Sequence, residues 1–323
     1  MARLREDVSR IAARAYPGAG VSPLALLALA VSGGPDSVAM LALAAAAFPG
    51  RVVVATFDHR LRAGSADEAA MVAALCGQLG VPHVTLVPDT PIAGSSIQMR
   101  ARESRYAALI GWAGRAGAAA LLTAHHADDQ AETLLMRLNR ASGVAGLTGI
   151  RAWRREGELL ILRPLLDWRR VELRRLASEA GLPFVDDPSN GDPRHDRARI
   201  RATLAAMPEI DPVRLARSAA YLAEAEEVLA GEAERLWGAN WQGSEHGLAI
   251  GGEAREMRRR LLRRAIGATR VAFGIERPPF SDSANVEALL DALEAGVAGV
   301  QGGVKVEATT RGWRFFPAPP RRS

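Results

Sequence analysis

The sequence contains a single cysteine, Cys76, among 323 residues. One thiol cannot form an internal disulfide, a CxxC redox pair, or a zinc or iron–sulfur site built from cysteines. Lysine is as scarce, since Lys305 is the only one in the chain. No lysine therefore follows any glycine pair to complete a GxxxxGK[ST] phosphate-binding loop. Chemistry that needs two thiols or this type of loop is excluded.

Long hydrophobic runs are missing as well. The two longest, residues 24–31 and 38–48, are each about half of what a bilayer span needs. The first seven residues include acids and lack the basic-then-apolar order of a signal peptide. These absences predict a soluble, cytoplasmic protein with no membrane partner.

Composition and length predict a folded protein of two domains. Hydrophobic residues make up 48% and charged residues 24% of the chain, which is enough to bury a sizeable core. The net charge of +5 comes from residues 137–201, which hold 14 Arg against 9 Asp and Glu, while the flanking regions are balanced. This stretch could face the phosphates of a nucleic acid. It could equally be solvated surface, because the chain uses arginine throughout.

The N-terminal region alternates short apolar runs with longer helical patterns, which predicts an α/β fold with a doubly wound parallel sheet. The apolar runs are nearly continuous, as is typical of strands covered on both faces. The predicted strands cover residues 25–31, 51–57, 83–87 and 118–123, and the helices between and after them cover residues 36–47, 66–79, 98–116 and 128–140.

Beyond residue 143 the pattern changes. A short apolar run at 159–162, a helix at 168–180 and a turn-rich segment at 186–193 complete the first predicted domain, residues 1–207. Residues 208–323 form a smaller, mainly helical C-terminal domain. Its predicted helices cover residues 211–237, 252–266 and 285–295.

The first motif with chemical meaning directly follows a predicted strand and opens a helix. It consists of Ser32, Gly33, Gly34, Pro35, Asp36 and Ser37. The glycines permit a tight turn, and the free N–H groups at the helix start suit a phosphate or pyrophosphate. An acid in such a site is explained if a Mg²⁺ ion bridges Asp36 to phosphate oxygens. A plain turn with Asp36 as a helix-start acid is the alternative, but all six residues at a strand end favour nucleotide binding.

The second motif, HHADDQAET at 125–133, also lies at a strand end and a helix start. Because the carboxyl ends of parallel strands meet at one sheet edge, it should lie near residues 32–37. Asp129 and Glu132 share a helix face and could bind an ammonium group or Mg²⁺, and His125 could place a proton or a hydrogen bond. Alternatively, Asp128 and Asp129 cap the helix with Glu132 as a capping-box partner. A zinc site built on the two histidines lacks an evident third ligand.

Three further segments carry charge near the expected site. FDHRLR at 57–62 ends where an adenine or ribose would lie. Arg102 and Arg105 share a helical face and could contact a phosphate or pair with Glu103 and other acids. DPSNGD at 187–192, which includes Asn190, leads to Arg197 and Arg201. That segment is a plausible phosphate or RNA contact, or simply a surface loop before a helix.

Together these segments resemble the tRNA(Ile)-lysidine synthetases, within the PP-loop (N-type) ATP pyrophosphatases. The loop at 32–37 indicates only the larger group, with its adenine nucleotide alpha hydrolase-like fold. The narrower resemblance rests on the order and spacing of FDHRLR (57–62), ARESRY (101–106), TAHHADDQAET (123–133), RASGVAGL (140–147), RPLL (163–166) and DPSN (187–190).

The resemblance implies a reaction. ATP would adenylate O2 of the cytidine at the first anticodon position of a CAU-anticodon isoleucine tRNA, and L-lysine would then displace AMP to give lysidine. Ser32–Ser37 would bind ATP, Asp36 would hold Mg²⁺, and Arg102 or Arg105 would contact phosphate. Asp129 and Glu132 would receive the lysine or a metal, with His125, Asn190, Arg197 and Arg201 also in contact with substrate. Residues 208–323 would bind the tRNA, and a homodimer is a further expectation.

The chain departs from the family pattern at three positions. His195 and Ala198 stand where an aromatic residue and an asparagine are usual, and Arg60 replaces a glycine. Other PP-loop enzymes are alternatives, such as a tRNA thiolase or an ammonia-using NAD synthetase. A thiolase would need cysteines to carry sulfur. A nucleotide-binding or RNA-binding protein without catalysis is less consistent with Ser32, Asp36, Asp129 and Glu132 occurring together.

Overall fold

The computed structural model describes residues 1–15, 25–61, 64–94, 96–186 and 196–319. The chain divides into two compact units, Met1–Ala223 and Glu224–Ser323. The division falls inside the long helix α9, Pro212–Asn240. The domain boundary predicted at residue 207 lies in the loop that precedes this helix and stays a prediction.

The first unit is built on a six-stranded sheet in the order β3-β2-β1-β4-β6-β5. Five strands run parallel, and β5 pairs antiparallel with β6 at the edge. The strands are β1 Leu27–Ala30, β2 Val52–Phe57, β3 His83–Leu86, β4 Ala120–Leu122, β5 Trp153–Glu156 and β6 Leu159–Leu162. The four strands predicted in the N-terminal region are confirmed, each slightly shorter than its apolar run.

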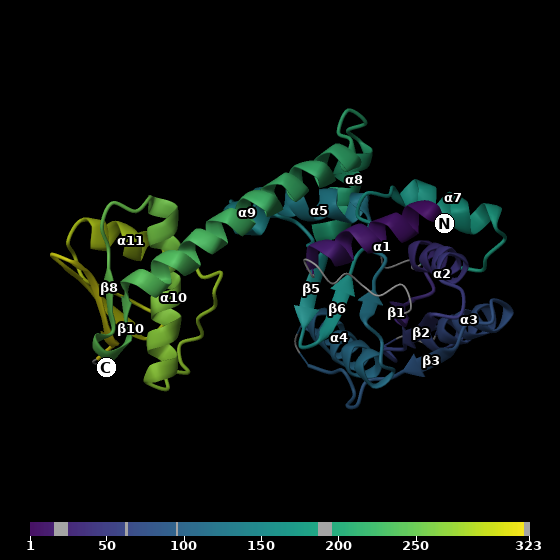
Figure 1. The fold of residues 1–323 in the computed structure, drawn as a ribbon, viewed down its shortest axis with the longest axis horizontal. Helices are drawn as coiled ribbons and strands as arrows, with labels where there is room; N and C mark the ends of the chain where they lie inside the picture. The colour runs from purple at the N-terminus through teal and green to yellow at the C-terminus, as the bar shows by residue number, and fades with distance from the viewer. Residues whose placement is uncertain (16–24, 62–63, 95, 187–195, 320–323) are drawn as a thin grey trace. The chain divides into compact units, whose positions relative to one another are not determined.

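Helices cover both faces of this sheet, so the doubly wound α/β prediction is confirmed (Figure 1). Alternate strand residues explain the two cores: Leu27 and Leu29 pack with the helices of one face, and Ala28 packs with α4 on the other. The helices are α1 Ala2–Ala15, α2 Pro35–Ala47, α3 Ser65–Gln78, α4 Ile97–Arg115, α5 Ala127–Leu138, α6 Val144–Leu147, α7 Arg170–Glu179 and α8 Asp196–Ala205. Helix α1 was not predicted from the sequence, and it packs beside β5 and β6 (Figure 1).

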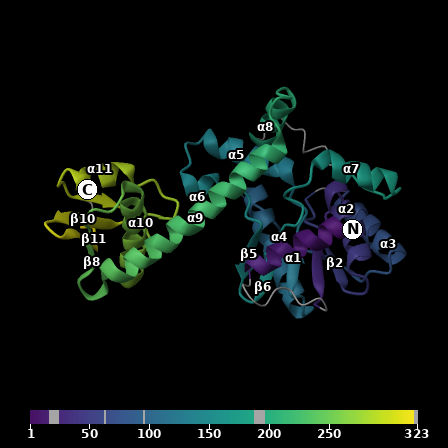
Figure 2. The same cartoon turned by 45° about the horizontal axis from the view of Figure 1, so that its top comes forward.

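The second unit combines helices with a sheet. The C-terminal part of α9, α10 Arg255–Ala272 and α11 Glu287–Glu294 confirm the three predicted helices. They share a core with a five-stranded antiparallel sheet that the sequence analysis did not predict (Figure 2). The sheet contains β7 Trp241–Gln242, β8 Gly247–Ala249, β9 Gly299–Gln301, β10 Val304–Thr309 and β11 Gly312–Pro317, with the 3-10 turn η2 Gly243–Glu245 between β7 and β8. Strands of two or three residues are too short to show an alternating pattern.

None of the helices in the described ranges is long and apolar enough to cross a membrane.

Candidate active site

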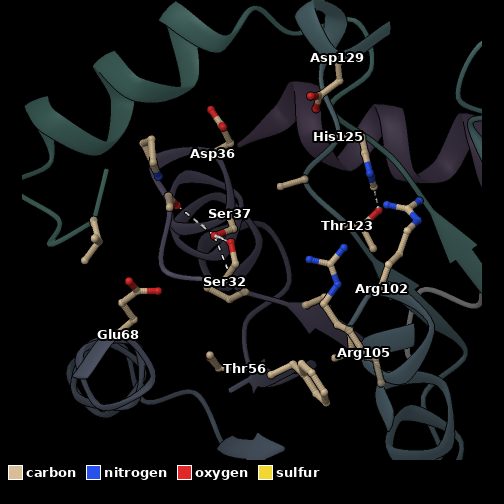
Figure 3. A pocket seen from close by; sticks show the side chains of 18 of the residues that line it. Ser32, Asp36, Ser37, Thr56, Glu68, Arg102, Arg105, Thr123, His125 and Asp129 are labelled. Atoms are coloured by element: carbon tan, nitrogen blue, oxygen red, sulfur yellow. Dashed lines mark hydrogen bonds between the residues drawn. The ribbon is translucent and has the colours of Figure 1, made fainter. Parts of the chain in front are cut away.

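A cavity of about 420 Å³ opens at the carboxyl ends of β1, β2 and β4. Its size suits a small-molecule ligand. Residues 32 and 34–37 line it from the β1–α2 turn, and the segment after β4 lines it with His125, His126 and Asp129 (Figure 3). The structure therefore brings the first two motifs together, as the convergence of parallel strand ends predicts.

The turn between β1 and α2 is preformed by its own hydrogen bonds. The Ser32 N–H donates to Ser37 Oγ at 3.1 Å, and that hydroxyl donates to the Gly34 carbonyl at 3.0 Å. Gly33 has φ +88°, which only glycine adopts without strain, and a Cβ there would lie 3.3 Å from Met71 Cε. Pro35 begins α2, so the first-turn N–H groups that follow lack helical partners. Such groups can receive phosphate oxygens.

Asp36 stands in this turn with one carboxylate oxygen unsatisfied. Its Oδ1 is buried without a hydrogen-bond partner, and its Oδ2 lies 3.5 Å from His126 Nε2. Asp36 is also an acid in the first turn of α2, whose N-cap is Gly34, so its position is compatible with the helix-start alternative as well. Among the described residues, no group of three His, Cys, Asp or Glu side chains could hold a metal alone. Asp36 Oδ1 fits a Mg²⁺ ion whose other ligands are phosphate oxygens and water.

His126, for which the sequence suggested only a role as a zinc ligand, is a central part of the site. It is the N-cap of α5 and forms a reciprocal capping box with Asp129. It is only 3% exposed. Burial alone would lower its pKa, but its hydrogen bond to Asp36 and the charges of Asp129, Asp36 and Asp128 outweigh burial and raise the pKa.

Asp129 lines the cavity directly (Figure 3). Burial would raise its pKa, yet the positive charges of His126 and Arg197, with the hydrogen bond from the His126 N–H, lower it. Asp129 therefore does take part in capping helix α5, as the alternative prediction has it. The N-cap residue is His126, however, and not Asp128. The capping hydrogen bond uses only Oδ2 of Asp129. The Asp129 carboxylate therefore stays charged beside the cavity. An ionised carboxylate at this position can receive an ammonium group.

Glu132 lies behind the cavity wall and is 1% exposed. Its Oε1 accepts from Arg201 Nε at 2.6 Å, and its Oε2 lies 3.3 Å from Arg197 Nε. Both arginines line the cavity, whereas Glu132 borders a second cavity of about 490 Å³. Glu132 compensates the charges of two arginines. The predicted pairing of Asp129 with Glu132 around one cation stays a prediction.

Arg102 and Arg105 reach the cavity from α4, on the side across from Glu68 (Figure 3). Their guanidinium carbons lie 5.1 and 5.6 Å from the ring centroid of Tyr106. Among the residues that the structure describes, neither has an acidic partner, so the alternative of pairing with Glu103 is not observed. Burial lowers the pKa of Arg105. Cations that lack a counter-charge at a cavity wall suit phosphate.

The remaining predicted residues fall in three places. Thr56, Phe57 and His59 line the cavity at the end of β2, where the sequence predicts the adenine or ribose. Arg60 has φ +56°, a left-handed conformation that explains why a glycine is usual there. Asn190 and His195 lie outside the described residues, and Ala198 lies in α8.

His125 is held uncharged. Its Nδ1 lies 3.0 Å from Thr123 Oγ1. Burial, with the nearby positive charges of Arg163, Arg102 and Arg105, lowers its pKa to about 3. His125 therefore stays neutral throughout the range in which histidine usually titrates.

This shift predicts a loss of stability in acid. Below the ordinary pKa of about 6.5, the unfolded chain binds a proton at residue 125 that the native state does not bind. The free energy of unfolding should therefore fall by about 2 kcal/mol from this group between pH 7 and pH 5. Denaturant unfolding of the wild type and of His125→Gln, which cannot titrate, tests this. Equal pH slopes for the two proteins would contradict it.

Much of the arginine charge is neutralised within each unit. In the middle stretch, Arg140 pairs with Asp196, Arg169 with Asp128 and Arg174 with Asp186. In the second unit, the basic helix α10 pairs Arg255, Arg258, Arg259 and Arg260 with Glu226, Glu256, Glu287, Asp291 and Glu294. Sequence charge therefore overstates the basic surface that α10 offers to RNA, since these arginines carry their counter-charges beside them.

Comparison with known proteins identifies close relatives. A family model described as the PP-loop domain matches residues 8–208. The tRNA(Ile)-lysidine synthase of Novosphingobium aromaticivorans is 44% identical over 94% of this chain and 92% of its own length. That of Zymomonas mobilis is 38% identical over 97% of this chain and 95% of its own.

A solved structure shares the fold. The U34-tRNA thiolase NcsA from Methanococcus maripaludis, which holds a [4Fe-4S] cluster, has a TM-score of 0.54 and 14% identity, covering 68% of this chain and 80% of that one. The single cysteine here could not supply the ligands of such a cluster. Cys76 is also buried, which raises its pKa to about 11 and keeps it a thiol. Thiolase chemistry is therefore disfavoured.

Proposed function

The chain belongs to the tRNA(Ile)-lysidine synthase family, and from this premise we propose that it joins L-lysine to C2 of the first-anticodon-position cytidine in a CAU-anticodon isoleucine tRNA. The reaction uses ATP and releases pyrophosphate and AMP. One feature of the candidate active site supports this proposal most directly. A single cavity holds a preformed anion-binding turn, two cations that have no acidic partner among the described residues, and an ionised aspartate.

In the first step, the cytidine O2 attacks the α-phosphorus of ATP, and the bond from that phosphorus to the bridging oxygen breaks. The departing pyrophosphate gains charge, which the first-turn N–H groups of α2 and the Ser32 hydroxyl would stabilise, while the Ser37 hydroxyl holds the turn through the Gly34 carbonyl. Arg102 and Arg105 face the cavity from another wall and would hold phosphate oxygens. Asp36, through Oδ1, would hold Mg²⁺, which when bound neutralises phosphate charge.

In the second step, the ε-ammonium of lysine releases a proton to solvent, and the lone pair of the resulting amine bonds to C2 while the C2–O2 bond breaks and AMP leaves with that electron pair. Asp129 would receive the lysine ammonium, because its carboxylate stays ionised beside the cavity. Glu132 would act from behind by orienting Arg197 and Arg201. The neutral His125 can donate or accept one hydrogen bond without adding charge.

The test is to incubate the purified protein with ATP, Mg²⁺ and unmodified isoleucine tRNA, with and without lysine. Mass spectrometry of the digested RNA should show a lysine-dependent mass gain on the first anticodon cytidine. An unmodified cytidine in intact tRNA would contradict the assignment. If the protein instead cleaved ATP to AMP and pyrophosphate with another acceptor molecule, only the assignment to PP-loop ATP pyrophosphatases in general would stand. A cytoplasmic location, a homodimer and tRNA binding by residues 208–323 stay predictions.

A further inference from the structure

Helix α1 carries an acid on its buried face. Asp7 is 8% exposed and lies among apolar residues of α1 that pack into the core of the first unit, such as Leu4 and Val8. An acid in such a position is unfavourable unless hydrogen bonds compensate it. Its Oδ2 accepts from the indole Nε1 of Trp168 at 3.0 Å, and its Oδ1 accepts from Arg10 at 2.7 Å. A core position of α1 is thus used to hold a residue far along the chain.

Trp168 is held from several sides. It is 6% exposed, and the guanidinium carbon of Arg3 lies 4.1 Å from the centroid of its ring. Arg3 also donates to the carbonyl of the preceding residue, Asp167, at 2.7 Å. Arg10 donates to the Asp167 carboxylate at 3.2 Å. Together with Asp7, these side chains of α1 fix the segment that leads into α7.

The backbone of this segment completes the start of α5. The Trp168 carbonyl accepts the N–H of Ala127, the first residue of α5, at 2.9 Å. In return, Asp128 Oδ2 accepts the N–H of Arg170, the first residue of α7, at 2.7 Å. The first N–H groups of a helix have no partner within it, so each helix start supplies one for the other. The same first turn of α5 carries Asp129, which lines the cavity.

We propose that Asp7 and Trp168 are positioning residues: the hydrogen bond between them holds the Trp168 backbone, which sets the first turn of α5 so that Asp129 faces the cavity. Neither Asp7 nor Trp168 lines the cavity. They act on the reaction only through the backbone that meets α5. The inference rests on the proposed function for the substrate group, the lysine ammonium, that Asp129 receives.

Removing this hydrogen bond should weaken the use of lysine and spare that of ATP. Trp168→Phe keeps an aromatic ring in the core but cannot donate to Asp7, whose buried carboxylate then lacks one partner. Because small misplacements of substrate-binding groups are costly, the KM for lysine should rise by roughly tenfold. The KM for ATP should not change, since the turn at residues 32–37 is held by its own hydrogen bonds. A wild-type KM for lysine, or equal increases in both KM values, would overturn the proposal.

Variants of α1 separate positioning from folding. Asp7→Ala should raise the KM for lysine as Trp168→Phe does, and the double variant should be no worse than either, since both changes remove the same bond. Asp7→Asn can still accept from the indole and should restore the wild-type KM. Val8→Ala is the matched control, because it removes buried methyl groups from the same helix. It should lower the melting temperature without changing the KM for lysine.

The control also sets the limit of the proposal. If Val8→Ala raised the KM for lysine as much as Asp7→Ala does, loose packing of α1 would explain the effect and the positioning role would be rejected. If Trp168→Phe does not fold, the contrast between Asp7→Ala and Asp7→Asn decides.

Backbone hydrogen exchange tests the positioning without the reaction. In Trp168→Phe and Asp7→Ala, the N–H of Ala127 should exchange roughly tenfold faster than in the wild type, because the carbonyl that accepts it is no longer held. The amides of strand β4 should keep their protection. If the wild type forms no lysidine, the proposed function fails, yet faster exchange at Ala127 would still support the positioning role. Unchanged exchange at Ala127 in both variants would reject that role, whichever reaction the protein catalyses.

Discussion

Replacing Asp36 with asparagine should reduce the rate of lysidine formation by about 10³-fold, because a metal bound to the phosphates contributes several kcal/mol to the transition state. Asparagine keeps the size of the side chain and one oxygen, but it removes the charge that holds the cation. The buried Oδ1 of Asp36 has no hydrogen bond to lose. The fold should therefore persist, and the loss should appear in kcat more than in the affinity for ATP.

Single-turnover kinetics with mass-spectrometric detection measure this effect. Asp67→Asn is the matched control, since Asp67 is an exposed acid in the first turn of another helix, α3, outside the cavity. It should retain full activity. A raised Mg²⁺ concentration should partly restore Asp36→Asn if the weakened site still binds the ion. A rate within threefold of wild type would reject the metal-binding role of Asp36.

Asp129→Asn should separate the two steps of the reaction. The ammonium of lysine would lose its charged partner, so the KM for lysine should rise on the order of 100-fold, as expected when a charge-assisted hydrogen bond in a buried site is removed. The KM for ATP should change little, because the anion-binding turn is made by residues 32–37. Adenylated tRNA should then accumulate at ordinary lysine concentrations.

The measurement is lysidine formation as a function of lysine at saturating ATP, with the adenylated intermediate followed by labelled α-phosphate. Asparagine can still accept the His126 N–H bond that Asp129 makes at the start of α5. Stability should therefore fall only slightly, and thermal unfolding checks this. Equal increases in the KM values for lysine and ATP would contradict a specific role in receiving lysine.

The α/β architecture and the place of the site could be predicted from the sequence because their signals are local. Strands buried on both faces produce continuous apolar runs, and the loop at 32–37 carries its glycines, proline and hydroxyls in six consecutive residues. The topology of parallel strands then requires the segments after β1 and β4 to meet at one edge. No long-range contact had to be known for this inference.

The sheet of the second unit and helix α1 were missed for different reasons. Strands β7, β8 and β9 have two or three residues, so no period of two can be recognised in them. Strand β10, Val304–Thr309, is six residues long and does alternate between apolar and polar residues, so its pattern was available and was overlooked. Helix α1 lies against β5 and β6, and its burial depends on a sheet edge that forms more than 130 residues later in the chain. Its stability comes from that packing, which local propensity does not report.

By itself the sequence determined which segments meet at the site: the turn after β1 and the residues after β4, with His125 and Asp129, stand at strand ends around one cavity. Only the tertiary structure decided how their charges are shared. It places Glu132 under Arg197 and Arg201, and it ties most arginines of α10 to acids of their own unit. The physical reason is that an ion pair depends on which side chains meet across the fold, and charges far apart in the chain carry no local pattern that reveals their partners.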